Sequence, residues 1–310
     1  MRGRHADHIL LNVVPAATNR RVMRTTLVTA REALDLLYHE YDAQHTVADP
    51  VHIVRRYSDP ADREVVGFCA AGLAFGRVAS VIDSVESLLA VMGASPARFV
   101  RRFDPDRDGR FVQALGHRWI SGHDLVALLW ILRQMVEGSG SIGAFFQLGY
   151  APDAEDVGSA LDSFCTRARA FSLDHVYRTG SGQRRVAYFF PRPGDGSACK
   201  RLNLYLRWMV RRDQIDFGVW SDVDRAKLVV PLDTHVIRVG TCLGLTRKRS
   251  PGWAMAREIT AGLRRLDPVD PVKYDFSLCH LGMQNACGFN KPQGDEQCPL
   301  RGVCRPGRHS

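Results

Sequence analysis

Hydrophobic residues recur along most of the chain at the spacing of an α-helix. Residues 25–44 show this clearly, because one face of the wound segment collects Leu27, Ala30, Leu34, Leu37, Tyr38 and Tyr41. Short breaks rich in Gly, Pro and Asp separate further segments of the same kind. They predict helices over residues 61–75, 78–92, 96–103, 123–137, 155–172, 197–211, 233–243, 251–265 and 271–286. The sequence therefore predicts a mostly α protein.

Two stretches depart from the helical pattern. RRVAYFFPRP (184–193) is predicted to be a short extended stretch that leads into a turn. RRFDPDRDGR (101–110) superficially resembles a calcium loop, but it lacks the bidentate acid at the loop's end, so we expect a polar turn. The sequence shows no repeat of fixed period and no heptad pattern.

Composition and charge narrow the choice of partners. The chain has 310 residues, of which 45% are hydrophobic and 24% charged, and a formal net charge of +9. This basic balance suits a polyanionic partner, and a solvated basic surface explains it as well. No apolar run approaches the roughly 20 residues that span a bilayer. We therefore expect a cytoplasmic protein without membrane contact, preceded by a flexible arm at residues 1–24.

The eight cysteines fall into two sets. Four are scattered singly in helical contexts and are predicted to be buried small residues: Cys69, Cys165, Cys199 and Cys242. The other four gather near the C-terminus: Cys279, Cys287, Cys298 and Cys304. This distribution favours a reducing compartment and one local metal site over a disulfide framework. Four thiolates suit an iron–sulfur cluster or zinc.

A glycine-rich turn precedes the predicted helix at 197–211. Gly194 and Gly196 form a tight turn, and Ser197 is expected to cap the helix. Such a turn presents backbone N–H groups to an anion such as a DNA phosphate. At about 100° per residue, the side of this helix opposite its apolar face carries Lys200, Asn203, Arg207 and Arg211. This stripe is either a solvated basic face or a face laid against DNA.

A single carboxylate, Asp233, stands before the apolar helical run in VPLDTHVIRVGTCLGL (230–245). An Asp in this position caps a helix by accepting hydrogen bonds from its first N–H groups. The alternative is a catalytic carboxylate that the helix start holds in place. The stretch alone favours the cap.

Together these segments carry a resemblance. The Gly-x-Gly turn, the lysine that begins the next helix and the later run Pro-Leu-Asp-Thr-His-Val-x-Arg-Val…Leu-Gly-Leu resemble the helix-hairpin-helix–GPD superfamily of DNA glycosylases. The resemblance covers roughly residues 180–305. The separation of Lys200 and Asp233 is longer than in endonuclease III, with DQIDFGVWSDVDRAKL as an apparent insertion. It is closer to that of the archaeal 8-oxoguanine glycosylases.

The resemblance implies an architecture and a reaction. We expect residues 50–215 to form a helical barrel, and residues 25–49 with 216–310 to form a second helical domain across a DNA groove. We expect a monomer that excises a damaged base from double-stranded DNA and cuts at the abasic site, with Lys200 as nucleophile and Asp233 stabilising the sugar cation. The expected DNA contacts are Gly194, Gly196, Ser197, Arg201, Arg207, Arg211 and His235.

The C-terminal run CGFNKPQGDEQCPLRGVC (287–304) resembles the iron–sulfur loop of endonuclease III and the adenine glycosylases. Cys287, Cys298 and Cys304 match ligands of that loop, the second cysteine is missing, and Cys279 is the expected substitute for it. The implied cofactor is a 4Fe–4S cluster that fixes a basic loop beside DNA. Zinc, or free thiols without metal, are the alternatives.

Two other functions remain open at this point. One is an inactive DNA-binding or damage-sensing protein on the same scaffold. The other is an iron–sulfur protein of electron transfer or regulation, which would need neither Lys200 nor Asp233. The sequence does not name the excised base.

Overall fold

The computed structural model describes residues 30–41, 43–47, 49–177, 185–283 and 298–304. These residues are mostly helical, which confirms the predicted fold class. Their β pairing is limited to two isolated bridges, His117 with Ile120 and Arg212 with Phe217. The α-helices are α1 (Ala30–His39), α2 (Val51–Arg55), α3 (Pro60–Gly72), α4 (Val78–Met92), α5 (Pro96–Arg102), α6 (Pro105–Gln113), α7 (Gly122–Ser139), α8 (Ile142–Gln147), α9 (Gly158–Arg169), α11 (Lys200–Val210), α12 (Thr234–Cys242), α13 (Trp253–Leu266) and α14 (Asp275–Met283). Short 3-10 turns are η1 (Ala43–Thr46), η2 (Pro193–Asp195), η3 (Arg225–Lys227) and η4 (Pro271–Tyr274).

Capping side chains set several helix starts. Asp59 caps α3 by accepting the backbone N–H of Ala61 at 2.7 Å. Asp104 caps α6 in the same way, accepting the N–H of Asp106 at 2.9 Å. This second cap shows that the predicted polar turn over residues 101–110 is wrong. That stretch holds the end of α5, the capping residue and the first turns of α6.

The predicted extended stretch at residues 184–193 is also wrong where the structure describes it. The backbone N–H groups of Phe189 and Phe190 both donate to the carbonyl of Val186, at 2.9 and 3.3 Å, so the chain turns here. Both rings are buried. The run of aromatic residues that suggested a strand therefore serves the core instead.

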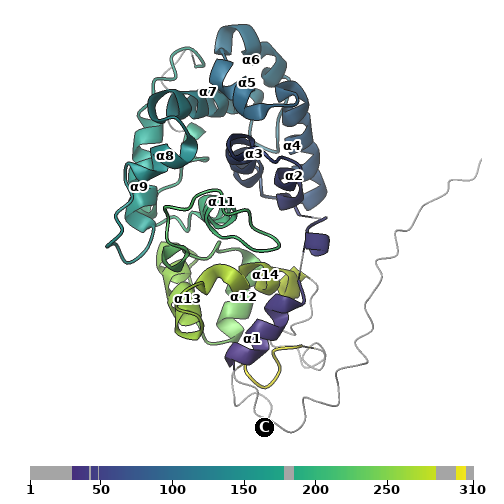
Figure 1. Cartoon of the computed structure of the whole chain (residues 1–310), viewed down its shortest axis with the longest axis vertical. Helices are drawn as coiled ribbons and strands as arrows, with labels where there is room; N and C mark the ends of the chain where they lie inside the picture. Colours follow the sequence, from purple (N-terminus) through teal and green to yellow (C-terminus); the bar gives the residue numbers. More distant parts are fainter. Residues whose placement is uncertain (1–29, 42, 48, 178–184, 284–297, 305–310) are drawn as a thin grey trace, which may run out of the picture.

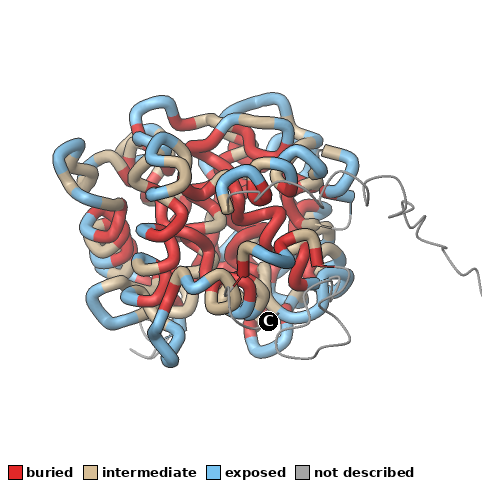
Figure 2. The backbone as a smooth tube through the Cα atoms, turned by 90° about the horizontal axis from the view of Figure 1, so that it is seen from below, coloured by how far each residue is buried: buried red, intermediate tan, exposed pale blue. Residues whose placement is uncertain are grey.

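The helices form two groups, with α11 between them (Figure 1). Helices α2 to α9 surround one side of α11, and α12, α13 and α14 lie on the other side with α1. α1 packs against η4 and α14, so the two ends of the described chain meet in the second group. The buried stretches of the backbone gather in the interior when the molecule is seen from below (Figure 2).

Helix α11 fits closely against α3. A Cβ atom at Gly67 of α3 would lie 3.0 Å from the Cε atom of Met209 and 3.3 Å from the ring of Tyr205, so a larger residue there would press on both side chains. Trp208 and Phe190 are fully buried, and Trp220 stacks on Phe146 at a centroid distance of 5.5 Å. Because their rings serve the core, these aromatic residues are not available to stack on a nucleobase.

Within the described ranges, no single helix is long and apolar enough to cross a membrane. Helices α4 and α5 meet that criterion only when they are counted together, and they are bent by 63° relative to each other.

Two arginines of α11 lie in a buried network of ion pairs. Arg207 contacts Asp216 at 3.1 Å and also bonds Asp275. Arg211 bonds Asp216 and contacts Asp270 at 2.8 Å. It also pairs with Asp213 on the loop that follows α11. Both arginine side chains are only 3% exposed. Since Asp270 and Asp275 lie just before η4 and at the start of α14, the network ties α11 to the second group of helices.

This network corrects the expected DNA contacts of Arg207 and Arg211. The polar stripe of α11 does point away from the apolar face, but it meets carboxylates of the second group instead of solvent. A guanidinium that is buried and already paired with carboxylates is not placed to meet a phosphate.

Replacing Arg207 by Met should strongly destabilise the protein. The change leaves the carboxylates of Asp216 and Asp275 buried without their shared cation, and breaking a buried pair in this way costs about 3–5 kcal/mol. Urea unfolding measures the loss. Arg56→Met is the matched control, because the pair of Arg56 with Glu86 at 2.8 Å is exposed and such pairs contribute about 0–1 kcal/mol. Equal losses in both variants would contradict the importance of the buried network.

Candidate active site

Asp233 is the N-cap of α12, and both of its carboxylate oxygens are held. Oδ1 accepts the backbone N–H of Val236 at 2.7 Å. Oδ2 accepts the thiol hydrogen of Cys279, whose Sγ atom on α14 lies 3.0 Å away. The side chain is half-buried. The cap predicted from the sequence is thus confirmed, and the carboxylate also has a fixed orientation that capping alone does not require.

The surroundings of Asp233 come mainly from α14. A Cβ atom at Gly282 would lie 2.5 Å from the Cβ atom of His235, so α12 and α14 approach too closely for a larger residue there.

Burial raises the pKa of the Asp275 carboxyl to about 7; Arg207 opposes this rise, and the nearby charge of Asp233 adds to it. Burial together with the charge of Asp233 also raises the pKa of the Cys279 thiol. Asp233 therefore faces a protonated thiol and lies near a second acidic group.

Lys200 is the first residue of α11 and is partly exposed. Cys199 occupies the N-cap position with φ +48°, and its N–H donates to the hydroxyl of Ser197 at 3.2 Å. The prediction that Ser197 caps this helix is therefore wrong by two residues. Lys200 lies two turns before Arg207 on the same stripe, about 10 Å along the axis. Because Arg207 contacts Asp275, this side of α11 faces the second group of helices, and Lys200 lies on the same side in the first turn of the helix.

The backbone N–H groups of the glycine turn before α11 donate to acceptors within the protein. Gly194 donates to Oδ1 of Asp162 on α9 at 2.9 Å, and Gly196 donates to the carbonyl of Pro193 at 2.9 Å. The N–H of Ser197 donates to the carbonyl of Arg192 at 3.3 Å. These bonds correct the expectation that Gly194, Gly196 and Ser197 bind a phosphate through free N–H groups. The turn instead joins α9 to the start of α11.

Two further expected DNA contacts, Arg201 and His235, are only partly exposed. Arg201 donates to the carbonyls of Gly72 and Tyr188, and its Cζ atom lies 3.4 Å from the ring centroid of Tyr188. Burial lowers the pKa of this guanidinium. In His235 the Nδ1 atom is buried and has no hydrogen-bond partner within the described ranges. Neither the Arg201 guanidinium nor this ring nitrogen is placed to meet a DNA phosphate.

A surface that the sequence did not reveal lies beside the start of α11. The His117–Ile120 bridge closes a two-residue tip formed by Arg118 and Trp119, and Trp119 is 59% exposed. Arg118 has φ +54°, a left-handed conformation that costs about 1–3 kcal/mol in a residue other than glycine. Its Cζ atom lies 5.4 Å from the ring centroid of Trp119. We call these two residues the Arg118–Trp119 tip.

Aromatic neighbours support this tip. The ring of Phe75 lies 4.5 Å from that of Trp119, and Tyr188 lies 5.8 Å from Trp119. Tyr188 in turn carries the guanidinium of Arg201, the residue after Lys200. The tip and the first turn of α11 are therefore linked through one aromatic cluster. The only local sign in the sequence is an Arg-Trp pair in a short polar break, which many surface loops share.

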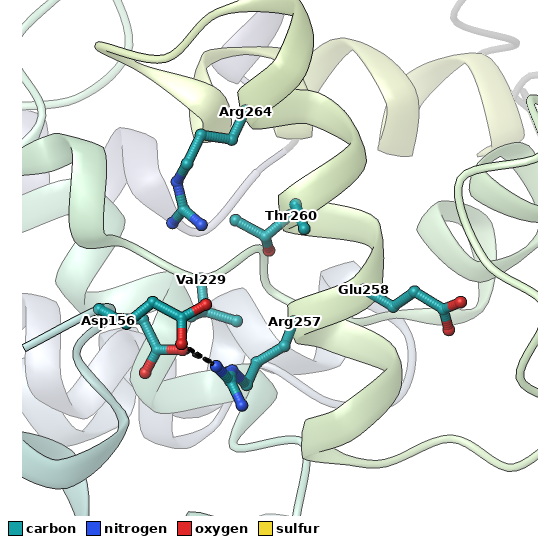
Figure 3. A pocket seen from close by; sticks show the side chains of 8 residues that line it. Asp156, Val229, Arg257, Glu258, Thr260 and Arg264 are labelled. Carbon is teal, nitrogen blue, oxygen red and sulfur yellow. Dashed lines mark hydrogen bonds and ion pairs between the residues drawn. The ribbon is translucent and has the colours of Figure 1, made fainter.

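One cavity lies on another part of the molecule, and none of the residues discussed above lines it. It has a volume of about 190 Å³ and is lined by α13 together with Glu155, Asp156 and Val229 (Figure 3). Arg257 forms 2.6 Å ion pairs with both Glu155 and Asp156, so its guanidinium is already paired within the protein. The cavity contains neither Lys200 nor Asp233.

Residues 49–284 match a family described as a protein of unknown function, DUF2400. The chain belongs to this family. No curated protein and no solved structure matches the chain. The part of this DUF2400 protein that matches contains Trp119, Lys200, Asp233 and Cys279, and it ends before Cys287.

The three described members of the expected ligand set of the DUF2400 protein, Cys279, Cys298 and Cys304, do not gather at one point. Among the described residues no three His, Cys, Asp or Glu side chains gather closely enough to hold a metal ion, although Cys279, Cys298 and Cys304 are all described. Cys287 lies outside the described residues. The thiol of Cys279 donates to Asp233 instead. The donor set with Cys279 as the fourth ligand therefore does not fit.

Proposed function

We propose that this DUF2400 protein removes a damaged base from double-stranded DNA and cuts the strand at the resulting abasic site. The observation that carries the proposal is the fixed carboxylate of Asp233, whose two oxygens accept hydrogen bonds at 2.7 and 3.0 Å. The sequence resemblance at residues 230–245 supplies the reaction class. Lys200 supports it, because it begins α11 on the same side as Arg207, which contacts Asp275 of α14.

The reaction uses these two residues in different ways. The free amine of Lys200 attacks C1′ of the damaged nucleotide, the new C–N bond replaces the glycosidic bond, and the base leaves with the bonding electron pair and takes a proton from water. The sugar carries positive charge while the old bond breaks, and the Asp233 carboxylate stabilises it. The adduct opens to a Schiff base. Loss of a C2′ proton then expels the 3′ phosphate and cuts the strand.

The DNA interface in this proposal is the Arg118–Trp119 tip and the adjoining start of α11. An exposed indole stacks on a nucleobase, and the neighbouring guanidinium of Arg118 attracts phosphate. The net charge of +9 favours association with DNA, and the proposal places the protein on the nucleoid. A base must leave the duplex before Lys200 can reach C1′, which costs a few kcal/mol. Stacking by Trp119 would offset part of that cost.

An iron–sulfur cluster takes no part in these steps. It stays a prediction that rests on the resemblance of the loop containing Cys287, Cys298 and Cys304. A structural cluster there would place the basic loop but would not alter the roles of Lys200 and Asp233.

Lys200→Gln should abolish both strand cutting and the covalent protein–DNA adduct that borohydride traps on an abasic duplex. The amide cannot form the Schiff base that borohydride reduces. Denaturing gels measure both products. Lys248→Gln, which removes an exposed lysine beyond α12, is the matched control and should leave both unchanged. Undiminished trapping in Lys200→Gln would remove Lys200 from the mechanism.

Asp233→Asn should lower the single-turnover rate of base release about 100-fold or more, because a neutral amide does not stabilise the sugar cation. Cutting at a preformed abasic site should fall less, since no glycosidic bond remains to break. A panel of duplexes with oxidised, deaminated or alkylated bases, assayed with and without alkali, measures both activities. Asp104→Asn changes an equivalent cap on α6 and controls for lost capping. If both variants lose stability equally and keep full base release, Asp233 is only a cap.

Trp119→Ala should weaken binding to an abasic duplex about 5- to 150-fold, the range expected for one lost base–aromatic stack. Fluorescence anisotropy at fixed salt measures the affinity. Phe111→Ala is the matched control, because Phe111 on α6 is 53% exposed and lies beside Arg110 in a similar cation–π pair at 4.7 Å. Equal losses in the two variants would show that the tip is not a specific DNA contact.

A further inference from the structure

The role of the Cys279 thiol needs an explanation, because it does not gather with Cys298 and Cys304, the other C-terminal cysteines that the structure describes. It lies on α14, and the nearest polar atom recorded for it is Oδ2 of Asp233 at 3.0 Å. The contact joins residues 46 positions apart in the chain. It therefore depends on how α12 and α14 pack and not on local sequence.

The packing of these two helices leaves little freedom at this contact. Gly282 lies one turn after Cys279 on α14, and its missing side chain lets the helix approach His235 of α12. His235 is two residues after Asp233. The close approach on one side and the hydrogen bond on the other fix α14 against the first turn of α12.

The chemistry of the donor matters for the carboxylate. The Sγ atom of Cys279 lies 3.0 Å from Oδ2 of Asp233, and a carboxylate oxygen at this distance accepts the thiol hydrogen. A thiol is a weak donor. It can orient Oδ2 while withdrawing less charge than an arginine or lysine would. Arg207, which contacts Asp275 on the same helix as Cys279, is bound to Asp216 and Asp275.

A protonated thiol is also a poor metal ligand, because metals bind the thiolate. Donation to Asp233 and ligation of an iron–sulfur cluster are thus competing uses of the same sulfur atom. The geometry supports the first use.

We propose that Cys279 is a positioning residue for Asp233 and not a ligand of a metal cluster. The catalytic part of this inference rests on the proposed function, whereas the contact itself does not. Cys279 holds one carboxylate oxygen while the N–H of Val236 holds the other. The carboxylate then presents its charge in one orientation to a sugar whose glycosidic bond is breaking.

Three variants of the full chain test the proposal. Cys279→Ala should slow single-turnover base release about tenfold, the factor that corresponds to one net hydrogen bond. Cutting at a preformed abasic site should stay within experimental error. Cys279→Ser should restore base release, because a hydroxyl also donates. Cys165→Ala is the matched control, since its buried thiol donates to the carbonyl of Pro191 at 3.2 Å, away from Asp233.

A second measurement does not depend on activity. Thermal unfolding of Cys279→Ala, Asp233→Asn and the double variant should be non-additive, because the two single changes remove the same hydrogen bond. Additive shifts overturn the contact. Iron and zinc contents of wild type and Cys279→Ser should be equal, and loss of metal in the variant overturns the proposal in favour of ligation.

The two proposals can fail separately. If the wild type releases no base from any duplex, the proposed function fails, and the unfolding cycle still decides whether Cys279 holds Asp233. If the wild type is active and Cys279→Ala lowers base release and abasic cutting equally, the residue is only structural and the inference is wrong.

Discussion

The arrangement of the molecule depends on two guanidinium groups that are buried between its two groups of helices. Arg207 and Arg211 have lost their water, which is unfavourable unless each charge is matched. The matching carboxylates come from the loop after α11 and from the segment around η4 and α14. A shift of α14 relative to α11 would separate these charges in a medium where separation is costly. The network therefore holds α11 in a fixed orientation relative to the second group of helices, and Lys200 lies on the side of α11 that carries the two arginines.

The same network determines the environment of Asp233. Asp275 belongs to α14, one turn before Cys279, and its pairing with Arg207 sets the position of that helix. Once Arg207 is committed to Asp216 and Asp275, the groups recorded as donating to Asp233 are a backbone N–H and a thiol. Both are neutral. A carboxylate with neutral partners keeps more of its charge for a developing cation than one in an ion pair, so the arginine network and the Asp233 contacts work together.

The sequence predicted most of the helices and the Asp233 cap, because both follow local rules, but it missed the helices α2, α6 and α8. Apolar spacing placed α4 at residues 78–92, and the Asp before an apolar run identified the start of α12. It failed where a partner is distant. The helical wheel correctly separated Arg207 and Arg211 from the apolar face. It cannot show whether that side meets solvent or carboxylates up to 68 positions further along the chain. The Cys279 contact also joins residues that are distant in the chain. The left-handed conformation of Arg118 is not visible in the spacing of apolar residues.

These corrections change how the positive charge of the chain must be understood. Arg201, Arg207 and Arg211 contribute to the net charge, yet their guanidinium groups contact carbonyls, a ring and carboxylates inside the protein. The basic stripe read from the sequence is therefore a structural feature, and its charge is largely neutralised in place. Because these charges do not contribute to an interface, a surface proposed to bind DNA needs more binding free energy from each of its exposed contacts. The Arg118–Trp119 tip meets this requirement because it combines a π surface with a cation, and because its strained backbone holds both beside the first turn of α11. In the proposed function, stacking and shape contribute more than a large number of phosphate contacts to how DNA meets Lys200 and Asp233.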